Sequence, residues 1–116
     1  MFKPLYWTIT AEEIREYAAA SGDFNPIHTD PDYAQKAGLK GCIAHGMLVM
    51  ALGSRAIREW EAGDLTSYEA RFQAMTYPGE PLVVKGSWTD EEAGKGSVTV
   101  QNEKGEIKMK GTFTVK

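Results

Sequence analysis

The fold of this chain is decided by one apolar stretch, Ala44-His-Gly-Met-Leu-Val-Met-Ala-Leu-Gly53. We predict a helix here, over about residues 44–60, which makes it roughly 25 Å long at about 1.5 Å per residue. Because its first half is apolar on every side, the pattern predicts a helix that is buried on most of its faces. Polar side chains such as Arg55, Arg58 and Glu59 enter only toward its end.

Downstream of this helix the hydrophobic periodicity changes to two. Short turns at Tyr77-Pro-Gly-Glu80, Ala93-Gly-Lys-Gly96 and Asn102-Glu-Lys-Gly105 separate four alternating runs. Alternation joined by short turns predicts an antiparallel meander with one buried face. The positions expected on that face are Tyr68, Ala70, Phe72, Ala74, Leu82, Val84, Trp88, Val98, Val100, Ile107, Met109, Phe113 and Val115.

Upstream of the helix we expect one short strand and two small helices. The strand is predicted over residues 2–9, which are aromatic and β-branched. The sequence Thr10-Ala-Glu-Glu13 matches a capping box and predicts a helix over residues 11–20. A second helix is expected to start at the N-cap Asp30 and to end at Gly38. Together these elements predict an α+β fold in which a curved antiparallel sheet packs on a long central helix.

Length, charge and cysteine content restrict the class of protein. A chain of 116 residues predicts a single domain over 1–116. With 13 basic and 16 acidic residues the net charge is −3, which argues against nucleic acid or an anionic membrane as the main partner. The lone Cys42 excludes an internal disulfide and favours a reducing compartment. Since residues 1–7 resemble no secretory signal and no apolar stretch could span a bilayer, we expect a soluble, cytoplasmic protein.

The densest cluster of potentially reactive side chains is Ser21-Gly-Asp-Phe-Asn-Pro-Ile-His28. In a loop stiffened by proline, the carboxylate of Asp23 and the imidazole of His28 can converge and exchange protons near neutral pH. The spacing alone equally allows a structural loop. In that interpretation Asp23 and Asn25 form turns with their own backbone, and His28 is a hydrogen-bonded loop histidine.

The start of the central helix, Ala44-His-Gly-Met47, is a second candidate site. Free backbone N–H groups at a helix N-terminus favour negative charge, and glycine lets a ligand approach closely. The segment could therefore stabilise an oxyanion that develops on a carbonyl group. Close packing at Gly46 and a structural or capping role for His45 explain the same residues.

Together the two segments resemble a known family. The stretch Tyr17-Ala-Ala-Ala-Ser-Gly-Asp-Phe-Asn-Pro-Ile-His28 closely resembles the hydratase motif of the MaoC-like, (R)-specific enoyl-thioester hydratases. The stretch Ile43-Ala-His-Gly-Met-Leu48 resembles the start of that family's central helix, and the likeness extends over nearly the whole chain. The resemblance implies a hot-dog fold and a hydro-lyase that needs neither a cofactor nor a metal ion.

The resemblance also implies a role for each residue of the site. Asp23 and His28 would hold a water molecule between them, and the carboxylate would take a proton as the water attacks C3 of a trans-2-enoyl thioester. The His28 imidazolium would protonate C2, which gives an (R)-3-hydroxyacyl thioester, and dehydration is the reverse. Asn25 and Ser21 would orient this pair. The backbone N–H of Gly46 would receive the charge that develops on the thioester oxygen.

Substrate and partners follow from the same resemblance. The substrate would be a thioester of coenzyme A or of an acyl carrier protein, with the acyl chain near Ile27, Met47 and Met50. A homodimer or higher homo-oligomer is expected, with the active site near its interface, and a heteromer with a second hot-dog subunit is the alternative. Some relatives carry serine on the central helix where this chain has Ala51, which cannot supply the extra polar contact that a serine could make there.

Two other functions are compatible with the predicted fold. A hot-dog thioesterase would rely on an acidic residue on or near the central helix, and residues 44–54 contain no Asp or Glu. A non-catalytic subunit of a heteromeric dehydratase is expected to have lost the reactive pair, whereas this chain keeps both Asp23 and His28. The residues therefore favour a hydratase over either alternative.

Overall fold

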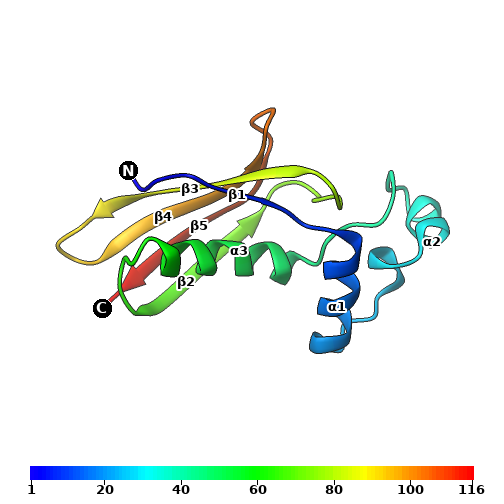
Figure 1. Cartoon of the computed structure of the whole chain (residues 1–116), viewed down its shortest axis with the longest axis horizontal. Helices are drawn as coiled ribbons and strands as arrows, with labels where there is room; N and C mark the ends of the chain where they lie inside the picture. The colour runs from blue at the N-terminus through cyan, green and yellow to red at the C-terminus, as the bar shows by residue number, and fades with distance from the viewer.

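The computed structural model describes all 116 residues and places one long helix along a five-stranded antiparallel sheet (Figure 1). The expected α+β arrangement is confirmed. None of the helices combines the length and the hydropathy that a membrane crossing requires. In chain order the elements are β1 (Leu5–Thr8), α1 (Ala11–Ser21), η1 (Pro26–His28), α2 (Pro31–Lys36), α3 (Gly46–Glu59), β2 (Leu65–Phe72), β3 (Pro81–Asp90), β4 (Lys95–Asn102) and β5 (Ile107–Val115).

The strand order in the sheet is β1-β3-β4-β5-β2. The predicted four-stranded meander is therefore correct for β3, β4 and β5 and wrong for β2, which pairs with β5 at the far edge. The physical reason is the connection over residues 73–80, which is too long for a hairpin turn. It crosses the sheet end beside β5, where the Gln73 N–H donates to the Lys108 carbonyl at 2.9 Å.

The core lies between α3 and one face of the sheet. The helix contributes Val49, Leu52, Ala56 and Ile57, which are at most 9% exposed. Opposite them lie the inward residues of three strands, as the alternation predicted. These sheet residues are Leu82, Val84, Val98, Val100, Met109, Phe113 and Val115.

A close approach between α3 and β2 depends on Gly53. A Cβ atom at this position would overlap the Tyr68 hydroxyl, so only glycine fits. The hydroxyl instead donates to the Met50 carbonyl at 2.7 Å and ties the strand to the helix. Burial raises the pKa of this phenol well above its usual range.

Two expectations for the central helix are wrong in the single chain. The helix begins at Gly46, two residues later than predicted, because His45 has extended backbone angles and is the N-cap. The helix is also not covered on most faces: Met47 is 60% exposed, and Ala51, one turn later, is exposed too. Phe72 at the end of β2 is 49% exposed, because no second layer packs on this part of the molecule.

The helices α1 and α2 lie beyond one end of the sheet, beside the start of α3 (Figure 1). The predicted strand is shorter than expected and covers Leu5–Thr8. Both halves of the capping box between Thr10 and Glu13 are formed, and α1 ends at Gly22 in the left-handed conformation with φ 76°. Asp30 caps α2 as predicted. These local signals are confirmed, and they fix the two ends of the loop that carries Asp23 and His28.

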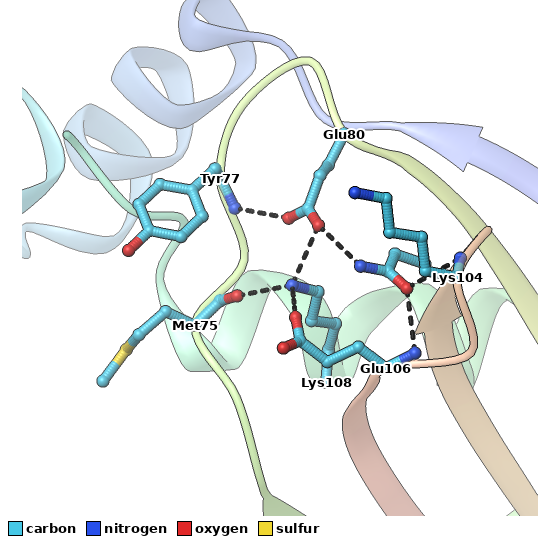
Figure 2. A network of polar contacts seen from close by, with 7 residues as sticks. Met75, Tyr77, Glu80, Lys104, Glu106 and Lys108 are labelled. Atoms are coloured by element: carbon cyan, nitrogen blue, oxygen red, sulfur yellow. Dashed lines mark hydrogen bonds and ion pairs between the residues drawn. The ribbon is translucent and has the colours of Figure 1, made fainter. Parts of the chain in front are cut away.

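A buried lysine ties the β2–β3 connection to the β4–β5 hairpin (Figure 2). Lys108 is 1% exposed, and its Nζ donates to the Met75 carbonyl at 2.8 Å. It also forms ion pairs with Glu80, at 2.9 Å, and with Glu106. Glu80 in turn accepts a hydrogen bond from the Asn102 side chain at 3.0 Å. The sequence pattern gave no sign of this network, since it assigned only Ile107 and Met109 on this part of β5 to the buried face.

Candidate active site

The loop between α1 and η1 is shaped by successive bonds from side chains to its own backbone. Ser21 Oγ accepts from the N–H of Asp23, and Asp23 Oδ1 accepts from the N–H of Asn25, both at 3.2 Å. Asn25 Oδ1 then accepts from the N–H of Ile27, also at 3.2 Å, and caps η1. Ser21 and Asn25 therefore support the site through the loop backbone. The second oxygen of Asp23, Oδ2, has no hydrogen-bond partner in the protein, and the residue is exposed.

His28 is buried and fixed by a carbonyl group of the segment that leads into α3. It is 8% exposed, and its Nδ1 lies 2.7 Å from the Ile43 carbonyl oxygen. Because a carbonyl only accepts, this nitrogen carries hydrogen, and Nε2 is the nitrogen left for chemistry. The N–H of Ile43 donates back to the Ile27 carbonyl at 3.1 Å. The turn-forming and the reactive interpretations are thus compatible, since the bonds that build the loop leave one nitrogen and one carboxylate oxygen free.

The structure brings together the Asp23 carboxylate, the His28 ring and a third residue, His45. One ligand atom from each of the three residues lies within 4.8 Å of the others. A single water that bonds to two groups at about 2.8 Å each bridges a gap of about 4.5 Å. A separation of up to 4.8 Å between Asp23 and His28 is compatible with one shared water molecule.

His45 is the residue of this site that the sequence analysis assigned only a structural or capping role. It is 2% exposed, and its ring stacks on His28 with centroids 3.6 Å apart and planes 21° from parallel. Its Nε2 lies 3.1 Å from the Asp23 carbonyl oxygen, and Tyr17 packs against the ring at 4.9 Å. Its side chain caps nothing. The only sequence signal for this placement was its position directly before Gly46.

The three side chains are a poor fit to a metal ion. In-plane lone pairs on two nearly parallel, stacked rings run side by side instead of converging on one point. One nitrogen of each ring is also already paired with a carbonyl oxygen, of Ile43 and of Asp23 respectively. The arrangement suits a water molecule better than a coordinated cation.

Gly46 directly follows His45 and is the first residue of α3. Its N–H has no hydrogen-bond partner in the chain, as is usual at a helix start. A Cβ at this position would lie 3.2 Å from the Phe72 ring, so close packing also favours glycine here. The two explanations of Gly46 do not conflict, because the N–H is free whichever of them requires the glycine.

The single chain leaves the region assigned to the acyl chain open. Ile27 and Met50 are half-buried, while Met47 is largely exposed. A cleft of about 530 Å³ lies elsewhere, at the end of α3 around Ile57 and Asp64. A tunnel for an acyl chain next to Asp23 and His28 would need a further wall.

The chain is similar to known proteins over most of its length. The family model for the MaoC like domain matches residues 3–110. A mitochondrial 3-hydroxyacyl-[acyl-carrier-protein] dehydratase from Arabidopsis thaliana is 36% identical over 75 residues, which cover 64% of this chain and 45% of that protein. Enoyl-CoA hydratase ChsH3 from Mycobacterium tuberculosis is 33% identical over 98 residues, which cover 81% of this chain and 34% of that protein.

Solved structures show the same fold. The R-hydratase PhaJ1 from Pseudomonas aeruginosa superimposes with a TM-score of 0.82 at 27% identity, over 97% of this chain and 77% of that one. The hot-dog arrangement that the sequence resemblance implied is thereby confirmed. The chain spans between 4% and 45% of the length of the curated relatives that it matches. Similarity over part of these proteins shows the family and the fold, and does not by itself transfer their activities.

Proposed function

The chain belongs to the MaoC-like domain family, and on this premise we propose that it catalyses the reversible hydration of trans-2-enoyl thioesters to (R)-3-hydroxyacyl thioesters. One observation carries the proposal. The Asp23 carboxylate and the His28 ring belong to a cluster in which one ligand atom of each residue lies within 4.8 Å of the others, which leaves room for one bridging water. An acid and a base on either side of a water molecule are what addition of water to a double bond requires.

The proposed reaction uses only these two side chains and the water. The Asp23 carboxylate takes one proton from the water as its oxygen forms the bond to C3. The His28 imidazolium gives a proton from Nε2 to C2, so that H and OH are added across the double bond. Return of the proton from Asp23 to His28 through solvent restores the starting state. No electrons are exchanged with a cofactor in this scheme, and we propose that none is needed.

The N-terminus of α3 is the group that stabilises the negative charge developing on the thioester oxygen in this scheme. As C3 is attacked, negative charge moves onto the thioester carbonyl, and the unpaired N–H of Gly46 is placed at a helix start that favours it. The absence of a side chain at Gly46 lets a carbonyl group approach the backbone. This support is independent of the Asp23 and His28 geometry.

The experiment that tests the proposed function follows two signals in one reaction. The purified full chain is mixed with trans-2-enoyl thioesters of increasing acyl length, on coenzyme A and on an acyl carrier protein. We expect the absorbance of the conjugated enoyl group to fall without release of free thiol. Thiol release without hydration would support the thioesterase alternative instead, and hydration only with a co-purified second hot-dog subunit would make this chain one half of a heteromer.

We also propose that the working unit is a homodimer that closes the acyl site. The support is the open edge of β2, which pairs only with β5, together with the exposed Phe72 and Met47 beside it. An unpaired edge next to exposed apolar side chains is a typical pairing surface.

Sedimentation at micromolar concentration should therefore give the mass of a dimer. Phe72→Lys should lower that mass to the monomer, because a charge would replace an apolar contact at the pairing edge. The matched control is Tyr6→Lys on the opposite edge strand β1, where Tyr6 is 76% exposed, and it should leave the dimer intact. A wild-type monomer, or equal effects of the two variants, would contradict this interface.

The cytoplasmic location also stays a proposal. Its support is a single thiol, Cys42, which forms no disulfide and suits a reducing compartment. A relative named as mitochondrial shows that related chains also occur in organelles. Imaging of a tagged chain in the native cell tests the location.

A further inference from the structure

His45 is a buried titratable side chain that the proposed reaction leaves without a role. We infer that it is a positioning residue, which sets the distance between the Asp23 carboxylate and the His28 ring by holding both residues at once. This inference rests on the proposed function, because the distance matters only if the two groups share a water molecule. His45 has a direct contact to each member of the pair.

The first contact is the hydrogen bond to the loop backbone. His45 Nε2 lies 3.1 Å from the Asp23 carbonyl oxygen, and a carbonyl can only accept, so Nε2 carries the hydrogen. The other nitrogen, Nδ1, is buried and has no partner. A hydrogen on Nδ1 would be an unsatisfied buried donor, which is costly. The surroundings therefore select one tautomer of His45, and that tautomer is the one that donates to Asp23.

The second contact is the ring stack on His28. The two rings are 3.6 Å apart and nearly parallel, and Tyr17 packs at an angle on the His45 ring with centroids 4.9 Å apart. Rotation of the His28 ring is therefore restrained twice, by the stack and by its Nδ1 bond to Ile43. The direction of the free His28 Nε2 is fixed as a result.

Together the contacts make His45 a bridge between the two reacting groups. Asp23 lies in the loop that follows α1 and His28 lies at the end of η1, with four residues between them in the sequence. His45 comes from the start of α3, whose following residues are anchored in the core. Because the core holds His45 in place, His45 in turn holds Asp23 and His28 at a fixed distance from each other. A misplacement of about 1 Å can lower a rate about a hundredfold, so a residue that sets the spacing acts mainly on kcat.

The test separates the two contacts with three substitutions in the full chain. His45→Gln keeps a donor near the position of Nε2 and removes the ring, and His45→Phe keeps a ring for the stack and removes the donor. His45→Ala removes both. We expect kcat to fall about tenfold in each of the first two variants and about a hundredfold in His45→Ala, with KM changed less than about threefold.

Thermal unfolding and a control on the same helix separate positioning from general damage. Ser54→Ala removes a hydrogen bond to the Ala51 carbonyl at a distance from the site and should leave kcat within about twofold. A His45→Phe variant that unfolds at the wild-type temperature but loses kcat supports positioning. Unchanged kcat in both His45→Gln and His45→Phe, or a loss that appears only in KM, would overturn it.

A second readout does not depend on activity. The chain has only two histidines, so ¹⁵N spectra of its imidazoles report His28 and His45 alone. We expect His45 as the Nε2–H tautomer in the wild type, and shifted or broadened His28 signals in His45→Ala. If His28 is unaffected there, the inference is wrong whatever the protein catalyses. If the wild type hydrates no enoyl thioester but its His28 signals respond, the proposed function fails and the structural bridge stands.

Discussion

Asp23→Asn should lower kcat for enoyl-thioester hydration by at least about a hundredfold, the usual contribution of a positioned acid or base. The substitution keeps a side-chain oxygen that can accept from the Asn25 N–H, so the loop keeps its turn. It removes the basic oxygen that takes the proton from water. We expect His28→Ala to lower kcat at least as much, because it removes the proton donor and also the bond to the Ile43 carbonyl.

Initial rates with a saturating short enoyl thioester check this expectation, together with the unfolding temperature of each variant. The matched control is Asp30→Asn, the same chemical change seven residues further on. Asp30 caps α2 through the N–H groups of Asp32 and Tyr33, and asparagine caps a helix about as well as aspartate. Its rate should stay within about twofold of the wild type. A folded Asp23→Asn enzyme with more than half of the wild-type rate would exclude Asp23 as the base.

The second large effect is expected on stability, at the buried Lys108. Lys108→Met keeps an unbranched side chain but removes the charge that pairs with Glu80 and Glu106 and the donor to Met75 (Figure 2). Loss of one partner of a buried ion pair costs about 3–5 kcal/mol, and Glu80 is 24% exposed, which places the expected loss near the lower end. For a domain of this size about 3 kcal/mol corresponds to a fall of roughly 10 °C in Tm.

Urea unfolding of the full chain measures this loss. Lys110→Met, two residues further along β5 at an exposed position, is the matched control and should change stability by less than about 0.5 kcal/mol. The double variant Lys108→Met with Glu80→Gln should be more stable than the sum of the single losses predicts, because the less exposed of the two acidic partners is then no longer left as an unpaired charge. Strictly additive losses would mean that the pair does not stabilise the fold as a unit.

The same network predicts how stability depends on pH. Burial alone would raise the pKa of Glu80, but hydrogen bonds from the Tyr77 N–H, Asn102 and Lys108 outweigh it and lower this pKa below its usual 4.5. Its stabilising effect is therefore present above pH 4.5 and is lost as the pH falls through the lowered value.

At alkaline pH the contribution of Lys108 to stability changes in the opposite direction. Burial alone would lower the pKa of Lys108, but hydrogen bonds to Glu106 and Glu80 and their negative charge outweigh it and raise this pKa above its usual 10.5. That contribution is complete below pH 10.5 and is lost as the pH rises through the raised value. The stability difference between wild type and Lys108→Met should thus be constant from about pH 5 to pH 10 and shrink on either side. A difference that vanishes near pH 7 would contradict the assignment.

Local sequence signals were sufficient wherever a structure depends on neighbouring residues. The sequence predicted three helix ends correctly: the capping box at Thr10, the glycine that ends α1 and the Asp30 cap. Each of them joins residues only two to four positions apart. The buried faces of β3, β4 and β5 were predicted for the same reason, since successive side chains of a strand point to opposite faces of the sheet regardless of what lies against them. The loop from Ser21 to His28 was identified from its residues, and the role proposed for it came from the resemblance to a family.

Contacts between distant segments could not be predicted from the sequence. Nothing in the residues after β2 showed that residues 73–80 would cross to β3 and cover Lys108, or that β2 would pair with β5. The exposure of Met47 and Phe72 was missed because alternation identifies an apolar face but not what covers it.

The residues alone predicted most of the helices and strands and the apolar central helix, and they marked Asp23 and His28 as a candidate pair. Only the tertiary structure decided that His45 joins that pair, through a bond across 22 positions and a stack across 17, and that Lys108 is buried. The physical reason is that periodicity and capping report free energies that act within a few residues. The position of a ring or an ammonium group across the fold depends on how whole elements pack, which no short segment encodes.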